Sequence, residues 1–162
     1  MNNATQSLTP DNQPVIPSVR LAVDQLVPAA SSAMDALDAC SRRSTIAPGL
    51  LEMVRARVSQ LNGCAYCVDM HSRDARAAGE TERRIYALPV WRETPFFTAR
   101  ERSALDLAEA GTRLTSGPVP EAVFQAAAAE FSEPELAELI WVIAVINAWN
   151  RLGALARPWP LT

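Results

Sequence analysis

Two cysteines and a histidine form the most chemically suggestive pattern in this 162-residue chain. Cys64 and Cys67 are separated by two residues, and His71, the only histidine, follows four residues after Cys67. Positions three and four apart share a face of an α-helix, so the three side chains would line one stripe. A helix start favours the thiolate, and a second thiol nearby closes a disulfide once the first is oxidised to sulfenic acid. The pattern therefore indicates a two-electron redox cycle without a bound cofactor.

Other interpretations of the same residues stay open at this point. Two unreactive cysteines in the core would fit the CxxC spacing. A structural zinc site needs four ligands, and here it could add only Cys40 or a carboxylate such as Glu52 to the motif. A thioredoxin-like domain would need β-strands around the CxxC motif, and no run of alternating β-branched residues is present.

The composition excludes several classes of function. With 15 arginines, no lysine and 18 acidic residues, the net charge is −3, which gives no basic surface for nucleic acid or an anionic membrane. The longest apolar run, Leu139 to Ile146, is far shorter than the roughly 20 residues that cross a bilayer. The N-terminus lacks the pattern of a secretory signal, and three cysteines are too few for a disulfide scaffold. We expect a cytoplasmic protein with neither a nucleic-acid nor a membrane partner.

Helices are the elements that must position these side chains. Apolar spacing, prolines and capping residues predict seven helical segments: 26–40, 48–61, 65–78, 81–88, 98–114, 120–129 and 132–156. The sequence therefore predicts an all-α domain of about six or seven helices over residues 19–162, with the CxxC motif at a helix N-terminus. Residues 1–18, which contain three prolines, are expected to be a disordered or extended leader. The turn at Asn62 and Gly63 would fold the preceding helix back, so that the Glu52 carboxylate faces the cysteine stripe.

Several residues outside this motif are expected to serve packing or solubility. From Leu136 to Trp149 the chain is apolar almost all the way round, which fits either a central core helix or one that also contacts another subunit. Trp141 and Trp149 share a face there, and one of them could wall the thiol pocket. Cys40, in phase with an apolar stripe, is expected to be buried. Most of a group of arginines are expected to form a solvated face: those at positions 55, 57, 73, 76, 83 and 84.

Residues 52–79 resemble the core motif of the alkylhydroperoxidase D-like (AhpD-like) family, within the carboxymuconolactone decarboxylase superfamily. The family signature is Glu-x11-Cys-x2-Cys-x3-His, and four residues meet every spacing: Glu52, Cys64, Cys67 and His71. The run from Ile146 to Arg151 also resembles the last helix of this group, so that the resemblance covers roughly residues 20–157. It implies a compact helical fold of the AhpD type.

The resemblance also implies roles for the four residues. Cys67 would be the peroxidatic thiol and Cys64 the resolving thiol, while Glu52 and His71 would relay protons, through water, to the leaving alkoxide. The protein would be an alkyl hydroperoxide reductase with no bound cofactor. An external dithiol, carried by a lipoyl-type or thioredoxin-like protein, would recycle it. Family members assemble as homo-oligomers, either trimers or hexamers.

One departure from the family pattern keeps two alternatives open. Tyr66 occupies a position where the best-studied members have a relay histidine, so the Tyr66 hydroxyl or a water would have to substitute for it. This difference motivates a dithiol redox sensor or carrier with little peroxidase turnover. A carboxymuconolactone decarboxylase-like enzyme of unknown substrate is the other alternative. Members that act as decarboxylases lack the cysteine pair, and Cys64 and Cys67 argue against that reaction here.

Overall fold

The computed structural model describes residues 15 and 17–161, and in these residues the chain is helical with no β-strand. The expected leader, residues 1–18, falls mostly outside the described residues. Eight α-helices and two 3-10 helices follow in order: α1 (Val23–Leu26), α2 (Pro28–Ser41), α3 (Pro48–Asn62), α4 (Ala65–Ala77), α5 (Glu82–Ala87), η2 (Leu88–Glu93), α6 (Ala99–Thr112), η3 (Leu114–Ser116), α7 (Glu121–Glu130) and α8 (Glu133–Ala156). The all-α prediction is confirmed. The seven predicted segments correspond to α2–α8, and the four-residue helix α1 is additional.

The helix ends follow local sequence signals. Pro28 and Pro48 occupy first-turn positions, where a missing backbone N–H costs nothing. Thr98 and Ser132 each form a complete capping box with a glutamate three residues later. These caps satisfy backbone donors that the first turn of a helix leaves unpaired.

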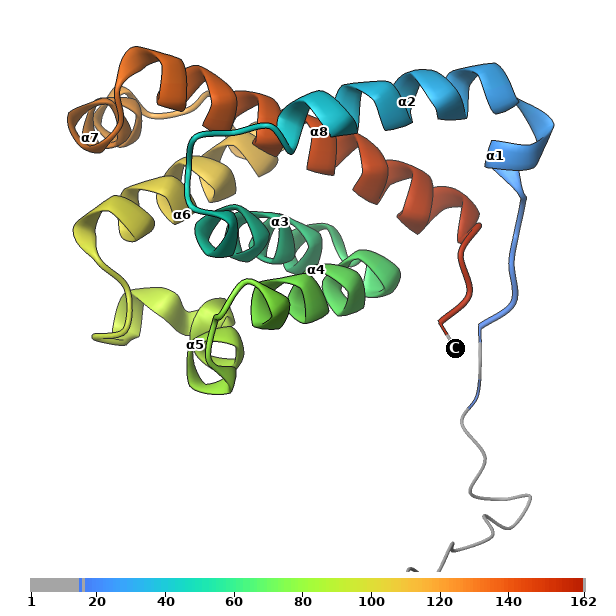
Figure 1. Cartoon of the computed structure of the whole chain (residues 1–162), viewed down its shortest axis with the longest axis horizontal. Coiled ribbons are helices and arrows are strands. Elements are labelled where there is room, and N and C mark those ends of the chain that lie inside the picture. The colour runs from blue at the N-terminus through green and yellow to red at the C-terminus, as the bar shows by residue number, and fades with distance from the viewer. Residues whose placement is uncertain (1–14, 16, 162) are drawn as a thin grey trace, which may run out of the picture.

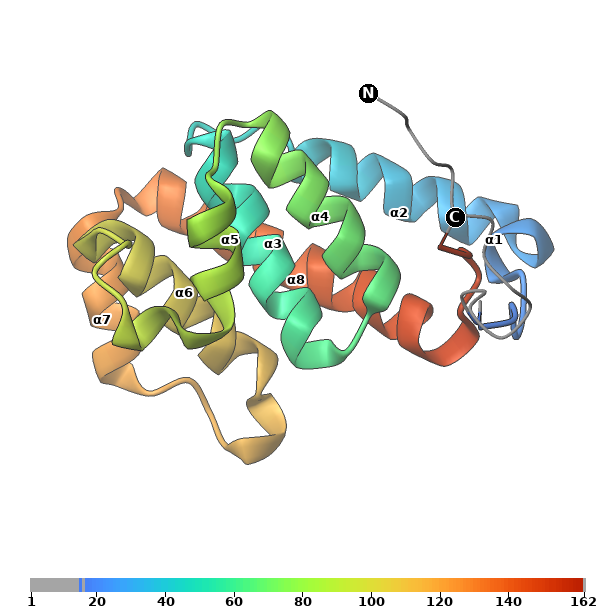
Figure 2. The ribbon, with the colours of Figure 1, turned by 90° about the horizontal axis from the view of Figure 1, so that it is seen from below.

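Helix α3 forms the centre of the molecule and packs against α4, α6 and α8. Figures 1 and 2 show α4 running alongside α3 and the long helix α8 crossing the molecule. Every residue of α3 from 49 to 59 is buried, which includes polar as well as apolar side chains. The apolar part of this core contains Met53, Val54 and Leu139. A central helix with buried polar residues is well placed to carry a functional site.

Helix α8 is covered on one side only. Val142 and Ile146 are buried in the core, whereas Ile140 and Trp141 are exposed. By length and composition alone α8 could cross a membrane, with a mean hydropathy of 1.5 over an 18-residue window of which 44% is buried in the chain. Core helices pass the same test, and such a helix is weak evidence for a membrane span. Within the part of the chain that the structure describes, one side of this apolar helix is therefore left uncovered.

Helix α2 lies along one edge of the molecule, where it packs chiefly against α8 (Figure 1). The expectation that Cys40 is buried is wrong: this cysteine is exposed and reduced. Leu26 and Leu37, which belong to the same predicted stripe, are exposed as well. A periodic stripe predicts burial only if a second element covers it, and no described element covers this side of α2.

The C-terminal segment folds back beside the N-terminal end of the described chain (Figures 1 and 2). Arg157 ends α8 in the left-handed conformation, with φ of 42°. The backbone N–H groups of Arg20 and Leu21 both donate to the carbonyl oxygen of Ala156, each at 3.1 Å. These hydrogen bonds join the two ends of the described chain next to the start of α4.

Candidate active site

The CxxC motif begins helix α4. Gly63 ends α3 in the left-handed conformation, with φ of 68°, and so allows the chain to turn directly into the next helix. Cys64 is the N-cap of α4, and its sulfur accepts a hydrogen bond from the backbone N–H of Cys67. The two cysteines form a disulfide with their Cα atoms 5.3 Å apart, and both residues are buried. The structure therefore holds the dithiol pair in its oxidised form at a helix N-terminus.

Helix α8 passes very close to this disulfide because residue 153 is a glycine. A Cβ atom at Gly153 would lie 2.6 Å from the Cys64 sulfur and 3.6 Å from the Cys67 sulfur. Any larger side chain would require the helix or the disulfide to move. Gly153 is thus part of the site, although its lack of a side chain gives no chemical signal in the sequence.

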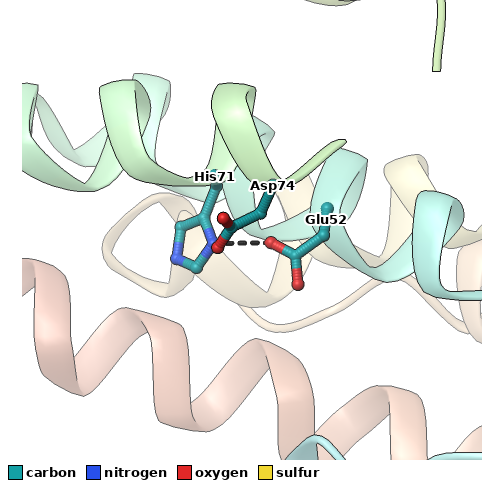
Figure 3. Close-up of side chains that lie close together, drawn as sticks. All are labelled: Glu52, His71 and Asp74. Carbon is teal, nitrogen blue, oxygen red and sulfur yellow. Dashed lines mark hydrogen bonds and ion pairs between the residues drawn. The ribbon is translucent and has the colours of Figure 1, made fainter. Parts of the chain in front are cut away.

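Glu52 and His71 meet across the interface of α3 and α4 in a buried hydrogen bond (Figure 3). The Oε2 atom of Glu52 lies 2.7 Å from Nδ1 of His71. Burial raises the pKa of the Glu52 carboxyl, but its hydrogen bond with His71 and the charge of Arg55 lower it by more, so that the pKa lies below its ordinary value. Glu52 is consequently a carboxylate at neutral pH, and it orients the imidazole ring.

Arg55 forms an ion pair with the same carboxylate from one turn further along α3. Its Nη1 donates to Oε1 of Glu52 at 2.6 Å, and its Nη2 donates to the backbone oxygen of Ser41 at 3.2 Å. Arg55 and Arg57 are buried and are exceptions to the solvated face expected of most of these arginines, whereas Arg73, Arg76 and Arg83 are exposed. Each of the two buried arginines is paired with a buried carboxylate, as a buried charge requires, and Arg57 pairs with Glu109.

Asp74 lies beside the Glu52–His71 pair, and Figure 3 shows it extending from the same helix as His71. One potential ligand atom from each of Glu52, His71 and Asp74 lies within 4.8 Å of the others, which is close enough to hold a metal ion. However, Glu52 is already neutralised by the Arg55 guanidinium, whose positive charge disfavours a cation at this point. The arrangement fits a proton-relay site better than a metal site.

Cys67 and His71 share a pocket of about 290 Å³. Tyr66 and Met70 of α4 line it beside them, and Ile146 and Trp149 reach it from α8. Of the two tryptophans considered from the sequence, Trp149 walls this pocket and Trp141 is exposed elsewhere. The remaining lining residues are Asp24, Ser31, Asp35, Asp38, Arg42 and Trp159.

Tyr66 packs against Trp159, with the ring centroids 5.3 Å apart. Trp159 follows the last helix and also contacts Trp149, at 5.7 Å between centroids. In the described part of the chain, the Tyr66 hydroxyl makes no hydrogen bond to Cys67 or His71. Tyr66 is therefore a wall of the pocket in this structure.

The structure thus brings the four sequence-predicted residues together at the α3–α4 interface. Besides Gly153, three further residues of the site were missed. Arg55 follows Glu52 by three positions, and Asp74 follows His71 by three. Residues three apart share a face of a helix, so this spacing could have identified both of them. Trp159 had no such signal, because its place depends on how the C-terminal segment folds back.

Comparisons with known proteins show the family of the chain. The model of the carboxymuconolactone decarboxylase family matches residues 28–110. The uncharacterised protein YdfG of Bacillus subtilis (strain 168) is 37% identical over 136 residues, which cover 84% of this chain and 92% of that protein. The chain belongs to the carboxymuconolactone decarboxylase family.

Solved structures extend the comparison to the fold. A protein of unknown function from Agrobacterium tumefaciens, named as a candidate antioxidant defence protein AhpD, superposes with a TM-score of 0.84 at 32% identity, covering 88% of this chain and 97% of that one. The debrominase Bmp8 superposes with a TM-score of 0.72 at 23% identity, covering 80% of this chain and 70% of that one. The second likeness concerns the fold alone. The chain is therefore an AhpD-like member of this superfamily.

Proposed function

We propose that this protein is a cysteine-dependent hydroperoxide reductase, recycled by an external dithiol. The observation that carries the proposal is the joint lining of one pocket by Cys67 and His71, with the His71 ring bound to the buried Glu52 carboxylate. A reactive thiol, a base and the group that orients the base are the parts that nucleophilic catalysis requires.

The proposed reaction proceeds in two steps on the enzyme. The Cys67 thiolate attacks one oxygen of the hydroperoxide, the O–O bond breaks, and the alkoxide leaves with a proton as an alcohol. Cys67 is then a sulfenic acid, and the Cys64 thiol condenses with it to form the disulfide and release water. A dithiol reductant returns two electrons to the disulfide and restores both thiols.

Glu52 and His71 are proposed to move the proton in this reaction. Because Nδ1 of His71 contacts Glu52, its other ring nitrogen, Nε2, is the one available to exchange a proton on the pocket side. The fixed carboxylate stabilises the imidazolium that forms when the thiol loses its proton. The neighbour named as a candidate AhpD antioxidant defence protein supports this assignment, while the debrominase indicates that the fold serves other reactions as well.

Steady-state consumption of cumene hydroperoxide, with dihydrolipoamide as reductant, tests the proposal. The Cys40→Ser variant is the background, because it removes the exposed thiol and leaves the CxxC motif intact. We expect turnover in this background and none above the buffer rate when Cys67→Ser is added. Equal rates in the two proteins would refute the assigned chemistry. Oxidation of Cys67 in one turnover without steady-state consumption would favour the redox sensor instead.

We further propose a homo-oligomer that acts in the cytoplasm, where cellular reductants keep dithiols reducible. Its support is an exposed apolar surface formed by α2 and α8, where Leu37, Ile140 and Trp141 are uncovered. A groove of about 220 Å³ lies between the same two helices, and Leu37 and Trp141 both line it. Sedimentation analysis of the wild type and Trp141→Glu tests this: the variant should shift toward a monomer, and a wild-type monomer would contradict the proposal.

A further inference from the structure

The Cys64–Cys67 disulfide lies between two pockets of different charge. Cys67 lines the pocket described above, and Cys64 lines a second pocket of about 220 Å³. Three aspartates and one arginine line the first pocket, whereas Arg20 and Arg157 are the only charged side chains among residues 15 and 17–161 that line the second. The two sulfur atoms are therefore approached through surroundings of different charge.

Arg157 has unused hydrogen-bonding capacity in the second pocket. Its Nε atom is buried and has no hydrogen-bond partner among the described residues. A buried donor without a partner is destabilising, and a charged donor more so. Because no described carboxylate lines this pocket, an anionic ligand is the natural partner for this group.

Arg20 adds a second positive charge from the opposite end of the described chain. Its Nη1 lies 3.4 Å from the backbone oxygen of Ala154 and 3.3 Å from that of Leu155, at the C-terminal end of α8. These contacts hold the guanidinium at the rim of the pocket, where it remains exposed. Two guanidinium groups beside one reactive sulfur provide a site for a carboxylate.

Tyr66 and Trp159 separate the two pockets, because each of them lines both. Their rings are in contact, with the centroids 5.3 Å apart. A ligand in the pocket of Cys64 therefore does not need to enter the pocket of Cys67.

We propose that the pocket lined by Arg20 and Arg157 binds the carboxylate of a small dithiol reductant and directs one of its thiolates to Cys64. The inference rests on the proposed function, in which the Cys64–Cys67 disulfide is reduced in every cycle. The peroxide enters on the Cys67 side, and the reductant enters on the Cys64 side.

The reduction is balanced as two thiol–disulfide exchanges. One thiolate of the reductant attacks Cys64, which forms a mixed disulfide and releases Cys67 as a thiolate. The second thiolate of the reductant then attacks the reductant's own sulfur in the mixed disulfide and releases Cys64. The reductant leaves as a cyclic disulfide, and two electrons have passed to the protein.

Dihydrolipoate and dihydrolipoamide provide a matched pair of probes, since they share the dithiol and differ in a carboxylate versus a neutral amide. Cys40→Ser protein, oxidised at the CxxC motif, would be mixed with each reductant at low salt, without peroxide. The fraction reduced is then measured by acid quench, alkylation and mass spectrometry. We expect dihydrolipoate to react about tenfold faster, which corresponds to about 1.4 kcal/mol of binding free energy. The net charge of −3 repels an anionic reductant from the protein as a whole. A preference for dihydrolipoate would therefore have to arise from positive charge close to the disulfide.

Substitutions assign this preference to the two arginines. Arg157→Gln and Arg20→Gln should each lower the ratio of the two rates toward one. Arg151→Gln should leave the ratio unchanged, because Arg151 is exposed and lines neither of the two pockets beside the disulfide. The dihydrolipoamide rate serves as an internal control for folding, because a misfolded variant would alter both rates. High salt should also lower the ratio, since it screens exposed charges.

Two outcomes would overturn the inference: equal rates for the two reductants in the parent protein, or a preference that survives both arginine substitutions. These outcomes are distinguishable from failure of the proposed function. If the disulfide prefers dihydrolipoate but no peroxide is consumed, the peroxidase assignment fails and the pocket assignment stands. If peroxide is consumed but the two reductants react equally, only the pocket assignment fails.

Discussion

Replacing Gly153 with alanine should destabilise the disulfide relative to the dithiol. The added Cβ would lie 2.6 Å from the Cys64 sulfur, closer than real Cβ contacts. In the oxidised protein this sulfur is fixed by its bond to Cys67, and the clash must be relieved by movement of the helix or the disulfide. In the reduced protein the Cys64 side chain can rotate away from α8. The substitution therefore acts mainly on the oxidised state.

The magnitude follows from the cost of overpacking. One extra methyl group in a tightly packed site costs about 1–3 kcal/mol. For a two-electron couple in which about 30 mV corresponds to about 1.4 kcal/mol, the reduction potential should rise by about 20–60 mV. The gain in helix propensity from glycine to alanine, about 1 kcal/mol, applies equally to both redox states and cancels from the difference.

The assay is equilibration of Cys40→Ser protein with buffers of defined dithiol to disulfide ratio, followed by alkylation and mass spectrometry. Gly111→Ala is the matched control. Gly111 is also a helical glycine, but a Cβ there would meet only the Ile143 side chain, at 3.4 Å. We expect Gly111→Ala to leave the potential unchanged. A shift below about 10 mV in Gly153→Ala, or an equal shift in both variants, would refute this account of the close approach of α8.

Three further predictions concern charged and polar groups. Glu52→Gln should lower kcat/KM for hydroperoxide, because His71 loses the carboxylate that orients its ring. The expected loss is about 100-fold or more, which is the range for loss of general acid–base catalysis. A change below threefold would contradict the proton relay. Glu109→Gln should lower the free energy of unfolding by about 3–5 kcal/mol in denaturant titrations at pH 7, because it leaves buried Arg57 without its anion. Tyr66→Phe should keep peroxide consumption within about twofold of wild type, because the Tyr66 ring forms a wall of the pocket and its hydroxyl has no part in the reaction. A tenfold loss would instead show that the hydroxyl takes part in the proton relay.

The Glu109 prediction also has a defined pH dependence. Burial raises the pKa of this carboxyl, but hydrogen bonds from Arg92, Trp91 and Arg57 lower it by more, to about 2. Its pKa is therefore lower in the folded than in the unfolded protein, so its contribution to stability is present above about pH 4.3 and is lost as the pH falls toward 2. The stability difference between wild type and Glu109→Gln should shrink over this interval, and a difference that is constant with pH would contradict the ion-pair explanation.

Local signals explain why most helix ends could be predicted from the sequence. Thr98 and Ser132 satisfy the first backbone donors of their helices through their own side chains, and Gly63 adopts a conformation that other residues avoid. These effects involve neighbours within a few residues and are legible without the fold. The contact between Glu52 and His71 could also be predicted from the sequence, because a single turn connects the two helices that carry them.

The errors concern residues whose surroundings depend on distant parts of the chain. Cys40 lies on a regular apolar stripe, but no described element covers that side of α2. Arg55 belongs to a group of arginines that alternate with acidic residues, and most of the group were expected to be solvated, whereas α3 is covered on several sides. Trp159 and Arg157 reach the disulfide only because the C-terminal segment folds back onto α4 and residues 20–21. No local pattern encodes such long-range placement.

The most direct test of the central claim is the identity of the oxidised sulfur after one equivalent of hydroperoxide. In Cys64→Ser protein on the Cys40→Ser background, the sulfenic acid on Cys67 cannot be resolved and can be trapped with a sulfenic-acid reagent for mass spectrometry. The proposed mechanism predicts a trapped adduct on Cys67 in this variant and no adduct on Cys64 in the corresponding Cys67→Ser variant. An adduct on Cys64, or none in either protein while wild type consumes peroxide, would contradict the mechanism.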